Sequence, residues 1–273
     1  MPAYPRIARA ALHFGEEPCI SGKNGSGTVF FSGCTLSCVF CQNSEISHKK
    51  HGKTVSPARL SEIFKELEQQ GAHNINLVNP THFVASIKAA LDIYKPHIPI
   101  IYNSSGYERV ETIRELNGYV DIYLPDLKYV NDDLATRISG VTDYFTYASA
   151  AILEMADQTG TPVFDDDGIM QKGTMVRHLV LPSHTKESIA VLDWLTQHKD
   201  ALYISIMFQY TPLGHLEEFP ELQRSLTKRE CEKIWDYAET RGITNGYIQD
   251  KKSNGVEMIP HFDLTGVVKY ENV

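Results

Sequence analysis

The 273-residue sequence predicts a single parallel α/β domain, and two observations support this prediction. Short runs of apolar and β-branched residues alternate with longer segments whose apolar residues recur every three or four positions. The alternation continues through six βα units without a second repeat period, a pattern typical of a parallel sheet covered by helices. The sheet is expected to be either open and doubly wound or a partial or full barrel, and in both folds ligands bind at the carboxyl ends of the strands.

The predicted strands are short and mostly apolar, as expected for strands that are buried on both faces. They cover residues 28–32, 75–79, 98–102, 120–124, 175–181 and 202–208, with a last short strand at 246–249. A hairpin with an Asp-Gly turn is predicted at 163–170. Its aspartates lack the spacing and the closing glutamate of a calcium-binding loop, so no calcium site is expected there.

The helices between the strands are predicted from apolar spacing and from residues that start and stop helices. Ser56 and Pro57 provide an N-cap and a first-turn proline for the first helix, which Gly71 ends. Thr227 and Glu230 form a capping box for the last helix. The predicted helices cover residues 57–71, 84–91, 110–116, 145–160, 184–197 and 227–242.

The composition narrows the class of protein. A formal net charge of −8 and the lack of a basic cluster argue against nucleic acid as a partner. No run of eighteen apolar residues is present, so no membrane span is expected, and no apolar signal-peptide core is found at the N-terminus. We therefore expect a cytoplasmic protein with one domain over residues 1–273, in which 27–250 form the barrel, 1–26 an N-terminal arm and 251–273 a tail.

Three cysteines follow the first predicted strand in the pattern CxxxCxxC: Cys34, Cys38 and Cys41. Their position after a strand places them at the edge of the sheet where ligands bind. Three thiolates on one loop are soft ligands that select zinc, copper(I) or an iron–sulfur cluster. A structural zinc ion takes four ligands and a simple electron-transfer cubane takes four cysteines. Three cysteines therefore leave one metal position open, where a substrate can bind.

Zinc is an alternative occupant of this loop, because His48 and His51 lie downstream and either is a candidate fourth ligand. Structural zinc sites usually combine two separate knuckles, and the sequence contains no second one. The remaining cysteines, Cys19 and Cys231, stand alone and are expected to be inert thiols.

The cysteine pattern, with Phe40 directly before the third cysteine, resembles the motif of the radical S-adenosylmethionine (SAM) superfamily. The resemblance implies that the three cysteines hold one [4Fe–4S] cluster, that SAM chelates the open iron, and that Phe40 lies against the adenine. It also implies a partial TIM barrel, (β/α)6-like, with both groups at the carboxyl ends of the strands. The implied chemistry is the reductive cleavage of SAM to a 5′-deoxyadenosyl radical that abstracts hydrogen from a substrate.

Within this superfamily the chain resembles the pyruvate formate-lyase activating enzyme and its relatives over nearly the whole barrel. Asp126 and Lys128 are similar to a D-x-K motif that contacts SAM in these enzymes. Asn103 and Ser104 fall where they carry a turn near the methionine part of SAM. These four side chains lie at predicted strand ends and offer the donors and acceptors that SAM requires. The alternative for Asp126 and Lys128 is a surface ion pair of little energetic value.

The fifth predicted strand carries an arginine at the position where the activating enzymes have one near SAM. A charge in the middle of a strand needs a partner inside the barrel, so Arg177 is expected to be paired there. His178 points to the opposite face by strand alternation, and we expect it to be structural.

Two stretches depart from the pattern of the activating enzymes. They carry G-G-E after the second strand, where this chain has residues 79–82, Asn-Pro-Thr-His. The resemblance therefore implies that Asn79, Thr81 or backbone carbonyls take over the contact to the amino group of SAM. Residues 209–211, Gln-Tyr-Thr, lack the histidine that contacts SAM in that family. Both departures resemble a poorly characterised branch of activase-like proteins.

The function implied by the resemblance is the activation of a glycyl radical enzyme or a similar protein, with an electron supplied by a flavodoxin or ferredoxin. One alternative is a radical SAM enzyme that acts on a small molecule. A non-catalytic iron–sulfur or zinc binding module is another. The residues that contact the substrate are not identified by the sequence.

Overall fold

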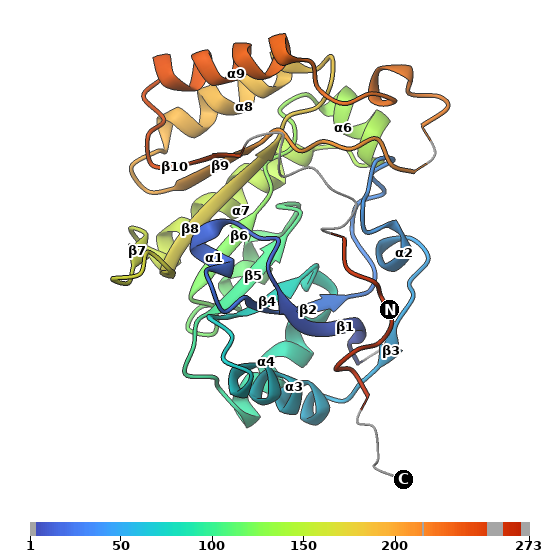
Figure 1. Ribbon diagram of the computed structural model, residues 1–273, viewed down its shortest axis with the longest axis vertical. Helices are drawn as coiled ribbons and strands as arrows, with labels where there is room; N and C mark the ends of the chain where they lie inside the picture. The colour runs from blue at the N-terminus through green and yellow to red at the C-terminus, as the bar shows by residue number, and fades with distance from the viewer. Residues whose placement is uncertain (1–3, 215, 250–258, 269–273) are drawn as a thin grey trace.

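A computed structural model describes residues 4–214, 216–249 and 259–268 of the chain (Figure 1). The strands are β1 (Arg6–His13), β2 (Ser26–Phe31), β3 (Lys53–Thr54), β4 (Ile75–Val78), β5 (Ile100–Ser104), β6 (Ile122–Pro125), β7 (Val163–Phe164), β8 (Met170–Leu179), β9 (Tyr203–Met207) and β10 (Gly246–Gln249). The helices are α1 (Pro18–Ser21), α2 (Ser44–Ser47), α3 (Pro57–Gln69), α4 (Val84–Ile93), α5 (Val110–Arg114), α6 (Asp132–Ser139), α7 (Tyr144–Thr159), α8 (Thr185–Gln197) and α9 (Lys228–Thr240), with short 3-10 turns at Thr81–Phe83 and Pro220–Leu222.

The sheet has the strand order of a partial barrel. Its order is β10-β9-β8-β6-β5-β4-β2-β1-β3, and all pairs from β2 to β10 along this path are parallel. The parallel strands follow one another in chain order without a reversal, whereas a doubly wound sheet reverses its order at a switch point. The alternative of a doubly wound sheet, left open by the sequence, is therefore excluded.

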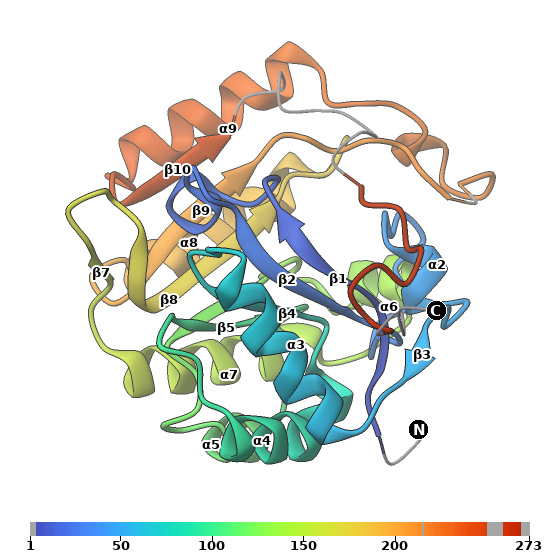
Figure 2. The same cartoon turned by 60° about the horizontal axis from the view of Figure 1, so that its bottom comes forward.

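Different clusters of buried side chains cover the outer and the inner face of the sheet. On the outer face α3 packs against α4, α5 against α7 and α8 against α9, over large apolar clusters (Figure 2). On the inner face α1 contributes Cys19 and Ile20 to a separate cluster of strand residues: Ile101, Ile122, Leu124, Met170 and Met175. The N-terminal segment therefore fills part of the inside of the partial barrel with this chain's own side chains.

Most of the predicted elements are confirmed within a few residues. The first-helix cap is present, since the Ser56 hydroxyl accepts a hydrogen bond from the Arg59 N–H at 3.2 Å. The capping box of Thr227 and Glu230 is present at the start of α9. The hairpin predicted at 163–170 is formed by β7 and β8, which pair antiparallel.

The structure adds elements that the sequence analysis did not contain. Strand β1 lies in the segment that was expected to be a plain arm, and it pairs antiparallel with β2. Helices α1, α2 and α6 were also not predicted. Residues 259–268 run beside β1, where the Leu264 N–H donates to the Ala8 carbonyl and the Ala10 N–H to the Thr265 carbonyl (Figure 2). The rest of the expected tail lies outside the described residues, and the division into one domain stays a prediction.

Within the part of the chain that the structure describes, no helix is both long enough and apolar enough to span a bilayer.

Candidate functional site

The cysteine loop leaves the carboxyl end of β2 and is held by backbone hydrogen bonds to two helices. The Gly33 N–H donates to the Ile46 carbonyl in α2 at 2.9 Å. On the other side, the Ser37 N–H donates to the Ser139 carbonyl at 2.9 Å, and the Val39 N–H to the Ile138 carbonyl at 2.9 Å, both at the end of α6. Since the last carbonyls of a helix have no partner within the helix, this end of α6 is a natural acceptor for the loop.

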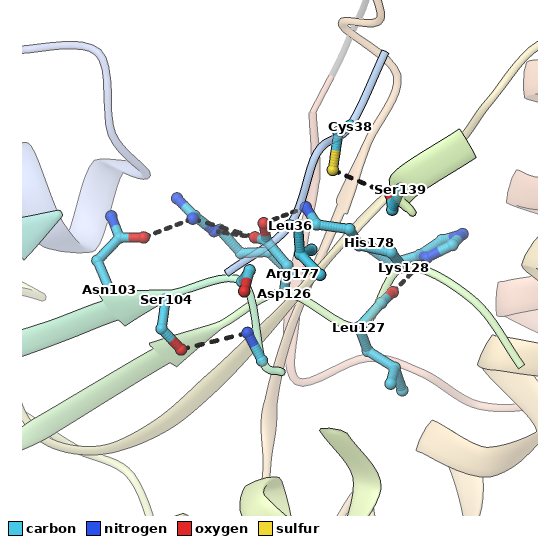
Figure 3. Close-up of polar contacts among 12 residues, drawn as sticks. Leu36, Cys38, Asn103, Ser104, Asp126, Leu127, Lys128, Ser139, Arg177 and His178 are labelled. Carbon is cyan, nitrogen blue, oxygen red and sulfur yellow. Dashed lines mark hydrogen bonds and ion pairs between the residues drawn. The ribbon is translucent and has the colours of Figure 1, made fainter. Parts of the chain in front are cut away.

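Each of the three cysteine sulfurs has one nearby polar group of this chain. The Leu36 N–H donates to the Cys34 sulfur at 3.4 Å. The Cys38 sulfur lies 2.9 Å from the Ser139 hydroxyl (Figure 3), and the Cys41 sulfur lies 3.3 Å from the Ser47 hydroxyl. None of the cysteines forms a disulfide.

The protonation of these thiols depends on burial and on neighbouring charges. Burial raises the pKa of the Cys34 thiol, and it raises the pKa of Cys38 to about 12. The neighbouring thiols act in the same direction, while the Lys128 ammonium group opposes the rise at both residues. Three thiolates so close together in a buried loop therefore require a strongly cationic group for charge balance.

A network of charged side chains lies at the carboxyl ends of β5, β6 and β8 (Figure 3). The Asp126 carboxylate accepts from Lys128 Nζ at 2.5 Å and from Arg177 Nε at 3.1 Å. Arg177 also donates to the Asn103 side-chain carbonyl at 2.7 Å and to the Glu16 carboxylate at 3.1 Å. The pairing expected for Arg177 is therefore present, and four of the residues assigned to SAM by resemblance meet here: Asn103, Asp126, Lys128 and Arg177.

In this network the attraction between opposite charges affects the pKa values more than burial does. Burial alone acts to raise the pKa of Asp126, but Lys128 and Arg177 hold it below its ordinary value. Burial likewise acts to lower the pKa of Lys128 and of Arg177, but the carboxylates beside them raise both. All three groups are therefore charged at neutral pH, and the alternative of a surface ion pair is wrong because the Asp126 and Lys128 side chains are only 18% and 16% exposed.

His178 has the structural role expected for it. Its Nδ1 lies 2.7 Å from the Leu127 carbonyl and its Nε2 lies 2.9 Å from the Ser188 hydroxyl. Burial lowers its pKa to about 4, so the ring is neutral and joins the loop after β6 to helix α8.

Thr81 and Ser104 belong to a second group around a buried carboxyl, Glu108. The Thr81 hydroxyl donates to Glu108 Oε1 at 2.5 Å, and the Tyr102 hydroxyl lies 3.3 Å from the same atom. The Ser104 hydroxyl also interacts with Glu108, and it accepts from the Gly106 N–H at 3.2 Å. The side chains of these two predicted SAM residues therefore interact with Glu108, while the Ser104 carbonyl accepts from the Asp126 N–H at 3.0 Å.

The side chains of the last two predicted residues, Phe40 and Asn79, are placed by other contacts. Phe40 is buried and packs edge to face on Tyr210, with ring centroids 5.9 Å apart. Asn79 has a left-handed backbone with φ of 56°, a conformation that asparagine tolerates better than most residues with a side chain. Its N–H donates to the Asn103 carbonyl at 3.0 Å, which joins the ends of β4 and β5.

Three parts of this region were missed by the sequence analysis. Glu16 comes from the N-terminal segment, outside the βα repeat, and nothing in the pattern indicated that it would reach Arg177. Glu108 follows the predicted third strand among mostly polar residues (103–112, NSSGYERVET), so the local sequence gave no signal that it would be buried. Tyr144 is fully buried, and its hydroxyl lies 2.8 and 2.9 Å from the Ser105 and Asp126 carbonyls, either of which can accept its one proton, so it joins the loops after β5 and β6.

The buried Glu108 predicts a pH dependence of stability. Burial raises its pKa from 4.5 to about 7, and its hydrogen bonds offset only part of this rise. Between these values the folded chain keeps a proton that the unfolded chain releases, so the free energy of unfolding falls as pH rises through this window. Glu108→Gln removes the titration. From pH 6 to 8 we expect E108Q to gain about 1–2 kcal/mol relative to the parent protein in urea unfolding.

The exposed Glu111→Gln variant in α5 is the control for this measurement, since its side chain lies in solvent. Unfolding curves for E108Q and the parent protein that stay parallel from pH 6 to 8 would contradict a buried, titrating Glu108.

Comparisons with known proteins agree with this arrangement. A model of the radical SAM superfamily matches residues 28–195. An uncharacterized protein of Methanocaldococcus jannaschii is 33% identical over 238 residues, which are 84% of this chain. The chain spans 65% of the length of that relative.

Two solved structures share the fold at low sequence identity. SuiB of Streptococcus suis has a TM-score of 0.52 and 13% identity, over 82% of this chain and 48% of its own. HydG, a maturase of the [FeFe]-hydrogenase, has a TM-score of 0.52 and 12% identity, over 81% of this chain and 51% of its own. The family match covers more than half of the chain, including the cysteine loop and the Asn103, Asp126, Lys128 and Arg177 part of the charged network. The chain therefore belongs to the radical SAM superfamily, whose members bind one [4Fe–4S] cluster and SAM.

Proposed function

We propose that this chain activates a glycyl radical enzyme or a similar protein by abstracting a hydrogen atom from it. Cys34, Cys38 and Cys41 ligate the cluster in this proposal, and the charged network beside them binds SAM. The observation that carries it is the Lys128 ammonium group, which interacts electrostatically with the Cys38 sulfur and forms an ion pair with Asp126. This double interaction supports the proposal that the cysteine loop and the charged network belong to one site.

The donor set of the loop fits an iron–sulfur cluster better than a single ion. Among the described residues, no group of three or more His, Cys, Asp or Glu side chains is gathered closely enough to hold one metal ion. A cubane takes each thiolate on a different iron, so its ligands lie farther apart than those of a single zinc ion. The Cys41 thiol acts to raise the pKa of Cys34, and Cys34 and Cys41 act to raise that of Cys38, which supports the three sulfurs lying around one such group.

The charged network has the groups that SAM requires. The methionine part of SAM carries an ammonium group and a carboxylate, and its ribose carries hydroxyls. Lys128 and Arg177 provide cations for the carboxylate, while Asp126 and Asn103 provide acceptors for the amino group and the hydroxyls. Phe40, Asn79, Thr81 and Ser104 are proposed to line the same edge. Because the charges are already paired in this structure, binding exchanges these pairs for contacts to SAM and leaves no charge bare.

The filled inner face of the sheet supports a protein substrate. α1 packs against strand residues inside the partial barrel. The side-chain amide of Asn76 in β4 donates a hydrogen bond to the Glu16 carboxylate at 3.1 Å. A substrate therefore reaches the site from outside, at the carboxyl ends of the strands. A glycine in a protruding loop suits such an approach, since no side chain shields its Cα–H bond.

When bound, the reduced cluster supplies one electron that splits SAM into methionine and a 5′-deoxyadenosyl radical. That radical would take a hydrogen atom from the substrate glycine, giving 5′-deoxyadenosine and a radical on the glycine. The electron comes from a low-potential donor such as a flavodoxin or ferredoxin. The residues of this chain bind and orient SAM and keep water away from the reacting atoms.

The experiment uses anaerobically reconstituted protein, a chemical reductant, SAM and a candidate glycyl radical enzyme labelled with α-deuterated glycine. The proposal predicts deuterium in the 5′-deoxyadenosine and a glycyl radical signal in electron paramagnetic resonance. Formation of 5′-deoxyadenosine without deuterium from any candidate protein, but with deuterium from a small molecule, would support the small-molecule alternative. Bound zinc without acid-labile sulfide would overturn the enzymatic function.

A further inference from the structure

A chain of two buried hydroxyl groups leads to the sulfur of Cys38. The Tyr129 hydroxyl lies 3.1 Å from the Ser139 hydroxyl, which in turn lies 2.9 Å from the Cys38 sulfur. Tyr129 and Ser139 are both fully buried, and Cys38 is 8% exposed. Figure 3 shows the Ser139 side chain directed at the Cys38 sulfur. Water therefore does not compete for these hydrogen bonds.

The backbone around this contact fixes its geometry. The Ser139 carbonyl accepts from the Ser37 N–H, and the neighbouring Ile138 carbonyl accepts from the Val39 N–H. The loop is thus bound to the end of α6 on both sides of Cys38 in the chain. Because the same residue supplies the carbonyl and the hydroxyl, the backbone contact holds the Ser139 Cα near Cys38, and only rotation about the Cα–Cβ bond can turn the hydroxyl away from the sulfur.

The direction of the hydrogen bonds follows from chemistry. A cysteine that ligates iron is a thiolate, which can only accept, so Ser139 must donate to it. The Ser139 oxygen then accepts from Tyr129, which keeps its proton because burial raises its pKa well above 10. The two donors point the same way, and each strengthens the other in a dry interior.

We infer that Ser139, oriented by Tyr129, raises the reduction potential of the cluster by donating a hydrogen bond to the Cys38 thiolate. The inference rests on the proposed ligation by Cys38. A donor at a ligand sulfur withdraws negative charge from the cluster, and this stabilises the reduced form, which carries one more electron. Ser139 is a positioning residue in this account, since it acts on the iron only through a ligand.

The other two sulfurs have weaker contacts. The Ser47 hydroxyl lies 3.3 Å from the Cys41 sulfur, and the Leu36 N–H lies 3.4 Å from the Cys34 sulfur. Both of these cysteines are only partly buried, so water reduces the effect of a donor there. Ser47→Ala therefore removes the same chemical group from a second ligand and is the matched control for Ser139→Ala.

The test is a redox titration of the reconstituted cluster without SAM, followed by electron paramagnetic resonance of the reduced form. S139A is expected to lower the equilibrium constant for one-electron reduction of the cluster about tenfold, which equals a fall of about 59 mV in its reduction potential. Tyr129→Phe keeps the serine but removes its orienting donor, and we expect a smaller shift in the same direction. S47A is expected to shift the potential less than S139A.

Each outcome decides the inference. A potential of S139A equal to that of the parent protein, or equal shifts in S139A and S47A, would overturn it. If S139A binds no iron, the test is the reduction potential of Y129F compared with that of S47A. A potential of Y129F equal to that of the parent protein would then overturn the inference. A cluster that forms in the parent protein but shows no shift in the variants refutes only this inference, whereas a parent protein without a cluster refutes the proposed function.

Discussion

Replacing Cys34, Cys38 or Cys41 singly by alanine is expected to abolish binding of the cluster. Formation of 5′-deoxyadenosine from SAM should fall by about 100-fold or more, because the iron that SAM chelates is lost with the cluster. Iron and acid-labile sulfide per chain, and 5′-deoxyadenosine by chromatography, provide the measurements. Folding is expected to persist, because Cys34 and Cys41 are only partly buried and the loop keeps its backbone bonds to α2 and α6.

Alanine at Cys19 or Cys231 is the matched control for these variants. Cys19 lies in α1 on the inner face and Cys231 lies in α9, both outside the CxxxCxxC loop. Both variants should keep a full complement of iron and sulfide. Loss of iron in either control, or retention of iron in a variant of the loop, would show that the wrong cysteines had been assigned.

Replacing Arg177 is expected to have the largest effect on stability. Arg177→Met leaves the carboxylates of Asp126 and Glu16 without the cation that both contact at 3.1 Å. Breaking a buried ion pair by removing one partner costs about 3–5 kcal/mol. Urea unfolding should show a loss in this range, and calorimetry on the cluster-loaded protein should show weaker binding of SAM. Arg177→Lys keeps a charge but lacks the three-way geometry of the guanidinium group, so we expect an intermediate loss.

Two further variants distinguish the loss of the buried network from the general effect of removing a charge. Arg114→Met removes an arginine whose side chain is 64% exposed and paired with Glu154, and it should change stability by less than about 1 kcal/mol. Asp126 keeps its ion pair with Lys128 in R177M, whereas Glu16 loses the Arg177 cation. Adding Glu16→Gln to R177M removes that carboxylate and should restore part of the loss. Equal effects of R114M and R177M, or no recovery in the double variant, would contradict a buried coupled network.

The sheet and its helices were largely predictable because their signals are local. Apolar spacing and the caps at Ser56 and Thr227 are properties of neighbouring residues, and the structure keeps them. The cysteine loop was predictable for the same reason, since its spacing and its place after a strand are contained in one stretch of chain. Arg177 was expected to need a partner because a charge in mid-strand is costly when buried.

The partners of these residues were not predictable because they come from distant parts of the chain. Glu16 reaches Arg177 across 161 positions, and Ser139 reaches Cys38 across 101. The order of the strands depends on how the βα units close, which apolar spacing alone does not determine. Helix α2 has a single turn, so its own sequence carries little signal. Helix α6 does carry local signals, the N-cap Asn131 and the C-cap Gly140, which the sequence analysis did not use.

The open iron position is the central claim of this account, and isotope-labelled SAM tests it most directly. Electron-nuclear double resonance on the reduced cluster with SAM labelled by nitrogen-15 in the amino group and oxygen-17 in the carboxylate reports whether these atoms bind iron. Three cysteine ligands and one open position predict hyperfine coupling to both labels. A four-iron cluster that binds SAM without coupling to either label would show that the position is occupied by another ligand, and would contradict the account.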